Sequence, residues 1–361
     1  MKLDLVQIQH LRNLQSVSIR PSHNLNFIVG ENGSGKSSIL EAVHYLGFGR
    51  SFRTAKHKNV IQHQQDAFTV FCECKSDTSE FKLGISRQSN DSFQVSVNGL
   101  KSTRVSELVS KLPVQIFTPQ SSDILLGAPK LRRKYLDWSL FHVEPSFYSC
   151  AGNYQKLLKH NNALLKVGKG DDRQASYWNG LLLKYGAELT DHRQNLVKQL
   201  IPLITDNLAK FLPEFNIEIS YYRGWEKGNS LSDSIIRNKE KDRRNGFISV
   251  GPHKADIKFR INGIAAHEVL SRGQLRMLVA ALQLASTQYL MSHTHKTSIF
   301  LLDDVGAELD AAKREVFIDM LLDSNAQLFV TAIEQHQIDF IDKYKDKKMF
   351  HVEHGQVREE I

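Results

Sequence analysis

Residues 30–37 constrain the fold of this chain most strongly, because their sequence, G-E-N-G-S-G-K-S, fits the pattern G-x-x-x-x-G-K-S. An apolar run at residues 25–29 precedes them and indicates a buried strand, and residues 38–43 have the composition of a helix start. A strand, a glycine-rich turn and a helix in this order gather backbone N–H groups around an anion. The sequence therefore predicts an α/β fold with a phosphate-binding loop for ATP or GTP.

The residue types of this segment suit phosphate binding. The glycines let the backbone turn sharply and direct successive N–H groups at phosphate oxygens. Lys36 is placed to reach the β- and γ-phosphates, and the Ser37 hydroxyl is placed to bind Mg²⁺. The predicted residues for binding ATP and Mg²⁺ here are Gly30, Glu31, Asn32, Gly33, Ser34, Gly35, Lys36, Ser37 and Ser38.

A second segment supplies the acids that such a loop needs. Residues 298–302 are mostly apolar and predict a buried strand, and Asp303 and Asp304 follow directly. A strand with terminal acids is common by itself, so the interpretation depends on the phosphate loop. In phosphate-loop proteins this strand lies beside the loop, which makes Asp303 the predicted Mg²⁺ ligand with Ser37. Asp304 is placed to polarise the attacking water, and the predicted catalytic residues are Lys36, Asp303 and Asp304.

A third candidate is the sequence L-S-R-G-Q at residues 270–274. Apolar residues follow it at the spacing of one helix face, and Ser271 is a natural N-cap for that helix. Ser271 and Gly273 would then present a hydroxyl and free N–H groups, which is a second anion site. A plain capped helix also explains the same residues.

Composition restricts the partners and the compartment. The chain has 361 residues and a formal charge of +8, which favours a polyanionic partner, although a basic surface without a partner has the same charge. Three cysteines do not complete a disulfide framework, and Cys72 and Cys74 alternate so that both face one side of a strand, where packing explains them. No apolar run approaches the roughly 20 residues of a membrane helix. We expect a cytoplasmic protein with no membrane contact.

The pattern along the chain predicts two domains, of which one is inserted into the other. Residues 1–125 form the β-rich N-terminal part of a head, with strands around residues 3–19 and 60–97 and a hairpin turn at Asn98-Gly99. Residues 126–245 form a mainly helical domain, in which residues 168–172 are a loop and the charged residues 237–244 are a solvated linker. Strands resume at Gly246, and residues 246–361 complete the head.

A phosphate loop, a distant L-S-x-G-Q and a strand ending in paired acids, in this order, resemble the ABC-type ATPases. Residues 307–310 (A-E-L-D) are similar to the D-loop of that class. The resemblance implies an ABC-type P-loop ATPase head that forms a head-to-tail homodimer when ATP binds. In such a dimer Ser271, Gly273 and Gln274 of one copy cap the ATP held by the other, so that the γ-phosphate acts as a dimerisation switch.

Within that class the chain is similar to the RecF family of bacterial recombination mediators. The resemblance implies binding of double-stranded or gapped DNA and slow ATP hydrolysis that DNA stimulates. It also implies action with RecR and RecO in loading RecA at single-strand gaps, in recombinational repair and the SOS response. The segments that carry it span the chain in order: residues 11–13, the phosphate loop at 30–37, and residues 49–54, 132–137, 251–253, 270–274 and 302–310.

Two residues depart from the wider ABC pattern. Asp304 occupies a position at which transporters have a longer Glu, and Thr331 occupies the position expected for a switch histidine. Both departures suit slow hydrolysis. Gln120 is placed where the switch-region glutamine is expected, but its surrounding sequence signal is weak.

The candidate DNA contacts are four arginines. Arg50 and Arg53 follow the first helix and either reach phosphate or form a basic helix terminus that the helix dipole favours. Arg132 and Arg133 either line a DNA surface or hold the helical domain against the head through ion pairs. Phosphate contacts of this kind would be independent of DNA sequence and sensitive to salt.

Four other functions fit the motifs less well. A nucleotide-binding subunit of an ABC-type transporter or of another protein complex is the main alternative, and the basic charge and β-rich start argue against it. The insert is too short and lacks the heptads of a long coiled-coil head. The chain has too few residues after position 310 for a nuclease module, and intact Lys36, Ser37 and Asp303 argue against an inactive scaffold.

Overall fold

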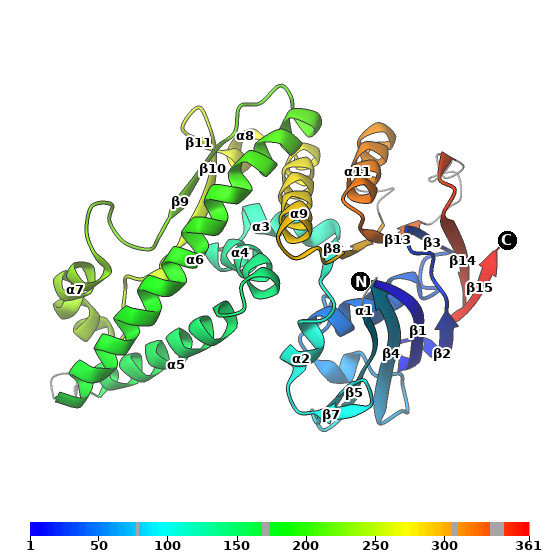
Figure 1. Cartoon of the computed structure of the whole chain (residues 1–361), viewed down its shortest axis with the longest axis horizontal. Helices are drawn as coiled ribbons and strands as arrows, with labels where there is room; N and C mark the ends of the chain where they lie inside the picture. Colours follow the sequence, from blue (N-terminus) through cyan, green and yellow to red (C-terminus); the bar gives the residue numbers. More distant parts are fainter. Residues whose placement is uncertain (77–78, 168–172, 305–308, 333–342, 361) are drawn as a thin grey trace. The chain divides into compact units, whose positions relative to one another are not determined.

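The computed structural model describes residues 1–76, 79–167, 173–304, 309–332 and 343–360 (Figure 1). The chain divides into two compact units. Unit 1 comprises residues 1–121 and 280–361, and unit 2 comprises residues 122–279. The second boundary falls inside one helix, α9 (Arg272–Thr294).

Unit 1 is built mainly from strands. Its elements are β1 (Lys2–Leu11), β2 (Leu14–Ile19), β3 (Leu25–Val29), α1 (Lys36–Phe48), η1 (His57–Asn59), β4 (Ala67–Ser76), β5 (Ser79–Gln88), β6 (Phe93–Val97), β7 (Leu100–Ser102), α2 (Val105–Val109), β8 (Val114–Phe117), the 3-10 turn η2 (Pro119–Ser122) at its boundary, β12 (Ile299–Leu302), α11 (Ala311–Asp323), β13 (Gln327–Ala332), β14 (Lys347–Glu353) and β15 (Gln356–Glu360).

Two six-stranded sheets organise unit 1. The first has the order β2-β1-β4-β5-β6-β7 and is antiparallel throughout. The second has the order β15-β14-β3-β13-β12-β8, in which only β15 runs antiparallel to its neighbour. Every residue of β3, β12 and β13 is buried, as expected for parallel strands that are covered on both faces. The carboxyl ends of these strands therefore meet at one edge of the sheet.

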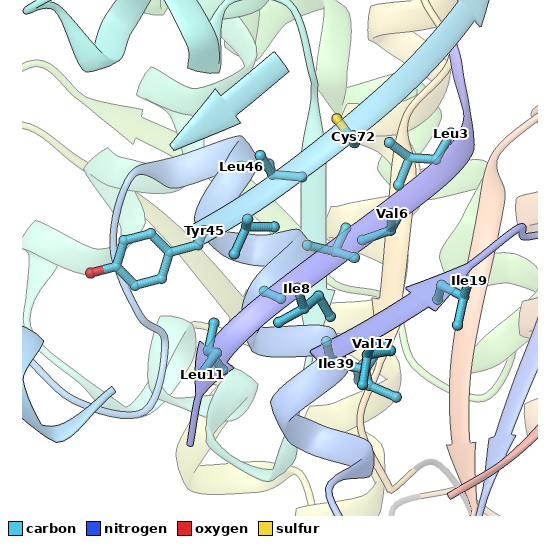
Figure 2. Close-up of a cluster of buried hydrophobic side chains, with 14 of the residues drawn as sticks. Leu3, Val6, Ile8, Leu11, Val17, Ile19, Ile39, Tyr45, Leu46 and Cys72 are labelled. Carbon is cyan, nitrogen blue, oxygen red and sulfur yellow. The ribbon is translucent and has the colours of Figure 1, made fainter. Parts of the chain in front are cut away.

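The core of unit 1 surrounds α1, which packs against strands of both sheets. Val6 and Ile8 of β1 point into this core and alternate with outward-facing residues, as a half-buried strand requires (Figure 2). Tyr45 of α1 is fully buried in the same cluster (Figure 2). Cys72 and Cys74 are both buried on the core side of β4, so their expected packing role is confirmed.

Unit 2 is mainly helical and contains one small sheet. Its elements are α3 (Asp123–Leu126), α4 (Pro129–Val143), α5 (Phe147–Lys166), α6 (Arg173–Phe211), β9 (Glu218–Tyr222), α7 (Leu231–Asn245), η3 (Pro252–Lys254), β10 (Asp256–Ile261), β11 (Ile264–Ala265), α8 (Ala266–Val269) and the first part of α9. The long helices α5 and α6 run side by side (Figure 1), and β11-β10-β9 form an antiparallel sheet.

A buried polar network ties the helices of unit 2 to the segment that precedes β10. Arg193 of α6 donates two hydrogen bonds to the Asp137 carboxylate, at 2.8 and 2.9 Å, and a third to the Pro252 carbonyl at 2.7 Å. The Tyr154 hydroxyl donates to Nδ1 of His253, whose Nε2 donates to the Ile248 carbonyl, if the ring carries its proton on Nε2. Burial lowers the pKa of His253 to about 4, so this ring is neutral near pH 7.

The structure confirms some expectations about local structure and corrects others. The strands around residues 3–19 and the hairpin turn at Asn98-Gly99 are present. The linker expected at residues 237–244 is wrong, because these residues continue α7, which Ser230 caps by accepting from the Asp233 amide and which Gly246 ends in a left-handed conformation.

The strand expected from Gly246 begins instead at Asp256, and β9 lies within the region expected to be helical. The strands β9 and β10 pair with each other, and residues 246–279 belong to the same compact unit as the helices. The sequence predicts these residues as part of the head. The loop expected at residues 168–172 lies outside the described residues. Among the helices that the structure describes, none is both long and apolar enough to cross a lipid bilayer.

Candidate functional site

The predicted phosphate loop connects the buried strand β3 to α1. Gly35, the residue before α1, has φ of +125°, which residues with a side chain rarely adopt. A Cβ added to Gly35 would approach Leu14 Cδ2 and Asn13 Nδ2 at 3.0 and 3.1 Å. The loop therefore needs glycine here for both its conformation and its close approach to the β1–β2 turn.

The turns of two β-hairpins, β1–β2 and β14–β15, donate hydrogen bonds to the phosphate loop. The Asn13 amide between β1 and β2 donates to the carbonyls of Ser34, at 2.9 Å, and of Gly33, at 3.2 Å, and accepts from the Ser38 hydroxyl. Gly355, in the turn between β14 and β15, donates its backbone N–H to the Ser34 carbonyl at 2.8 Å. Asn13 lies in a segment that carries the family resemblance, whereas no local sequence signal connects Gly355 with the loop.

Lys36 lies inside the loop rather than in solvent. Its ammonium donates to the carbonyls of Gly30 and Glu31, at 2.5 and 2.8 Å. Burial lowers the pKa of Lys36, and the negative charges of Asp304 and Asp303 oppose that shift. The two acids thus help to keep a positive charge at the loop, as phosphate binding requires.

The chain fold brings Ser37 and Asp303 into direct contact. The Ser37 hydroxyl donates to Asp303 Oδ1 at 2.9 Å, although 266 positions separate the two residues. The strand expected beside the loop, β12, does not pair with β3, because β13 lies between them in the sheet. A hydroxyl and a carboxylate oxygen at one point are the hard donors that Mg²⁺ prefers, so these two residues suit the metal predicted for them.

The strand β13 contributes Thr331, which joins the two acids. The Thr331 hydroxyl accepts from the Asp304 amide at 2.8 Å and donates to Asp303 Oδ1 at 3.0 Å, and the side chain is 1% exposed. In the sequence, Thr331 differs from its surroundings only by occupying the position expected for a switch histidine. Thr331 lies on β13, between β3, which leads into the phosphate loop, and β12, which leads into the two acids. Its hydroxyl therefore positions both acids.

Asp304 combines a rare backbone conformation with an unpaired oxygen. Its φ is +53°, in the left-handed region that is uncommon for residues other than glycine. Within the part of the chain that the structure describes, its buried Oδ1 has no hydrogen-bond partner, and the same is true of the buried Ser34 hydroxyl in the loop. Unpaired buried polar atoms are costly unless water or a ligand completes them.

A buried ion pair supports α1 behind the loop. Glu41 is fully buried and accepts two hydrogen bonds from the Arg12 guanidinium, at 2.8 and 2.9 Å. Arg53 lies 3.9 Å from the same carboxylate, and the Ser51 hydroxyl also donates to it. Residues 11–13 and 49–54, which carry the family resemblance, therefore meet at Glu41. Arg53 keeps a side chain that is 48% exposed.

The other predicted nucleotide contacts lie in unit 2, at the start of α9. The Ser271 hydroxyl accepts from the Gln274 amide at 3.3 Å, and the Gln274 side chain accepts from the Ser271 amide at 2.9 Å. This reciprocal capping box confirms Ser271 as the N-cap. Ser271 and Gly273 are exposed. Of the predicted D-loop at residues 307–310, residues 307 and 308 lie outside the described residues.

The structure separates the four candidate DNA arginines into two pairs. Arg50 is exposed at the end of α1, and Arg53 is partly exposed beside it. Arg132 forms a two-point ion pair with Asp256, at 2.7 and 3.1 Å, and Arg133 donates to the Ala255 carbonyl at 2.7 Å. Residues 132, 133, 255 and 256 all belong to unit 2, so these contacts are internal to that unit. Gln120 is exposed just after β8.

The chain is similar to known proteins over its whole length. The family model described as "RecF/RecN/SMC N terminal domain" matches residues 2–357. A "DNA replication and repair protein RecF" from Pseudoalteromonas atlantica is 69% identical, with all of both chains covered. A protein of the same description from Shewanella piezotolerans is 39% identical, with 99% of each chain covered.

Solved structures of related proteins have a similar fold. The structure described as "recombination mediator protein RecF-ATP in RecFOR pathway" superposes with a TM-score of 0.89 at 26% identity, covering 100% of this chain and 98% of the other. An Smc head domain from Pyrococcus yayanosii, at a TM-score of 0.60 and 13% identity, covers 99% of this chain and 96% of that one and shows likeness of fold alone.

The fold and the site define the class of protein: an α/β P-loop ATPase head of the ABC and SMC type, with a β-rich N-terminal lobe and an inserted, mainly helical part. Within this class, the chain belongs to the RecF family of DNA replication and repair proteins. The fold class and the family resemblance expected from the sequence are both confirmed.

Proposed function

We propose that this chain is an ATP-dependent DNA-binding protein and a slow, DNA-stimulated ATPase. It binds ATP and Mg²⁺ at the loop of residues 30–38, dimerises on ATP, and binds double-stranded or gapped DNA. It acts with RecR and RecO in loading RecA at single-strand gaps, in repair and the SOS response. The observation that carries this proposal is the 2.9 Å contact between Ser37 and Asp303 at the edge of the parallel sheet.

In the nucleotide site, Lys36 and the loop N–H groups bind the phosphates, and Ser37 and Asp303 hold Mg²⁺, which offsets phosphate charge. The unpaired Oδ1 of Asp304 suits an acceptor for the attacking water. Thr331 fixes the backbone of Asp304 and the carboxylate of Asp303. The shorter reach of Asp304, compared with a Glu, supports slow hydrolysis.

The proposed dimer completes the site from a second copy. Ser271 and Gly273 are exposed at the N-terminus of a long helix, where free N–H groups and the helix dipole favour an anion. Together with Gln274 they would contact the γ-phosphate that the other copy holds. Since ADP lacks the γ-phosphate, only ATP would favour the dimer. The extra contacts to the γ-phosphate would set how strongly nucleotide binding and dimerisation are coupled.

The proposed DNA surface includes Arg50 and Arg53, which retain exposed guanidinium groups, and the net charge of +8 supports it. Arg132 and Arg133 are weaker candidates, because Asp256 and a backbone carbonyl already occupy their donors. A homodimer would double the number of such contacts, and DNA binding would then depend on the nucleotide.

Fluorescence anisotropy of a labelled gapped duplex tests the proposal, with the protein titrated in ATP–Mg²⁺ and in ADP–Mg²⁺ at one moderate salt concentration. We expect binding about 5- to 150-fold tighter with ATP, the usual range of coupling between two sites. Lys36→Ala should remove the difference by abolishing ATP binding. Ser271→Arg should remove it while leaving ATP binding intact. Equal, weak binding in both nucleotides would refute the proposal.

A further inference from the structure

A mixed cluster of metal-binding side chains lies between the two longest helices of unit 2, α5 and α6 (Figure 1). Cys150 comes from α5, and Glu188 and His192 come from α6. Their ligand atoms all lie within 4.8 Å of one another. Among the described residues, no other group of three or more Cys, His, Asp or Glu meets this criterion.

The helix geometry explains why these residues meet. Glu188 and His192 are four positions apart, so they lie on one face of α6, and the His192 Nε2 to Glu188 Oε1 distance is 3.8 Å. Cys150 closes the cluster from the facing helix, where its side chain is 1% exposed. The His192 and Glu188 side chains are 19% and 39% exposed, which leaves solvent access from one side.

We propose that Cys150, Glu188 and His192 form a binding site for a transition-metal dication, of which Zn²⁺ is the best fit. Zn²⁺ takes S, N and O ligands at about 2.0–2.3 Å in tetrahedral geometry, so its ligand atoms lie about 3.3–3.8 Å apart. The histidine nitrogen and the glutamate oxygen lie 3.8 Å apart, within about 0.5 Å of the separation of N and O ligands on Zn²⁺. Because the three ligand atoms lie within 4.8 Å of one another, the thiol needs a change of at most about 1.5 Å, and water would take the fourth position.

The donor set distinguishes this site from the proposed Mg²⁺ site. Thiolate and imidazole select Zn²⁺ and similar ions, whereas Mg²⁺ prefers oxygen ligands alone. The neighbouring cation, Arg193, is paired with Asp137 through two hydrogen bonds, which reduces its repulsion of a bound ion. The Cys150 thiol donates to the Tyr185 carbonyl at 3.5 Å, and a bound dication would displace the proton of this thiol. A dication supplies the positive charge that the thiolate needs.

A bound ion would join α5 to α6 through side-chain bonds near the start of α5. The Ser146 hydroxyl, which lies 3.2 Å from His192 Nε2, belongs to the turn that precedes α5. Coordination of the ion by Nε2 would replace this contact with Ser146, so the ion would hold the helix pair and not the turn. The proposed metal site and the nucleotide loop share no residue, because all three ligands belong to unit 2 and the phosphate loop belongs to unit 1.

Titration of the full-length protein with Co²⁺ and with Zn²⁺, in excess Mg²⁺, tests the site. We expect one equivalent of Co²⁺ to give a thiolate-to-cobalt charge-transfer band and tetrahedral d–d bands, both displaced by Zn²⁺. His192→Gln and Glu188→Gln should weaken binding by about tenfold or more, because loss of an outer hydrogen-bond partner of a metal ligand already costs about 10- to 100-fold. Cys150→Ser should abolish the charge-transfer band.

His160→Gln is the matched control, because His160 is exposed on the same helix α5 and lies outside the cluster. This variant should keep the full signal. Circular dichroism checks that each variant folds, and His192→Gln, at a partly exposed position, remains informative even if Cys150→Ser does not fold. Absence of the charge-transfer band in the folded wild-type protein, or equal affinity in His192→Gln, would overturn the proposal.

Discussion

Replacing Thr331 by Val tests whether this hydroxyl positions both acids of the nucleotide site. Valine has nearly the same shape, so the fully packed end of β13 keeps its volume. The change removes one acceptor, for the Asp304 amide at 2.8 Å, and one donor, to Asp303 Oδ1 at 3.0 Å. Thr331→Ser keeps the hydroxyl and loses only a methyl group, which makes it the matched control.

The magnitude follows from these two contacts. A buried N–H left without a partner costs about 1–3 kcal/mol, and a hydrogen bond to a charged group contributes about 1.5–3 kcal/mol. Because the two contacts share one hydroxyl, they do not add fully, and we expect Thr331→Val to lower the free energy of unfolding by about 2–4 kcal/mol. If about 1.5 kcal/mol of that loss also falls on the transition state, hydrolysis slows about tenfold.

Urea unfolding and single-turnover ATP hydrolysis measure the two effects on the same samples. ATP affinity should change little, because the Thr331 hydroxyl forms its hydrogen bonds with Leu302, Asp303 and Asp304 rather than with the phosphate loop. Thr331→Ser should retain most of the stability and the rate. A Val variant with wild-type stability and rate would show that the hydroxyl positions neither acid.

Three further changes have defined outcomes. Asp304→Asn should slow hydrolysis by about 100-fold or more while ATP still drives dimerisation, and single-turnover assays with size-exclusion chromatography check this; unchanged hydrolysis removes Asp304 from the mechanism. Arg12→Met leaves buried Glu41 without its main partner and should cost about 3–5 kcal/mol in urea unfolding, most of which Glu41→Leu in the same chain should restore. Burial lowers the pKa of His253 to about 4 in the folded protein, so the unfolded chain binds more protons below about pH 6.5. The free energy of unfolding should therefore fall by up to about 1.4 kcal/mol per pH unit as the pH decreases from about 6.5 towards 4. His253→Gln should reduce that slope, and an unchanged slope contradicts the assignment.

Local sequence was sufficient where neighbouring residues determine the structure. Apolar residues before a glycine-rich turn predict β3 and the loop. Ser271 before an apolar helix face predicts the start of α9, where the structure adds the reciprocal contact with Gln274. Charge composition misled the interpretation of residues 237–244, because charged residues with a good N-cap and a glycine C-cap form a helix readily. The extent of the inserted part was missed, because pairing of β9 with β10 joins strands far apart in the sequence.

The sequence by itself determined the phosphate loop, the strand with paired acids, the class of fold and the family. Each motif behind these conclusions is formed by residues close together in the chain, and the order of the motifs is part of the sequence. Tertiary structure alone decided which distant groups meet. Parallel pairing of β3, β13 and β12 places Ser37, Thr331 and Asp303 at one edge of a sheet. The β14–β15 turn brings Gly355 to the loop, and the packing of α5 on α6 brings Cys150 to His192. Spacing in the chain does not encode these contacts, since strand order and helix packing depend on burial over the whole unit.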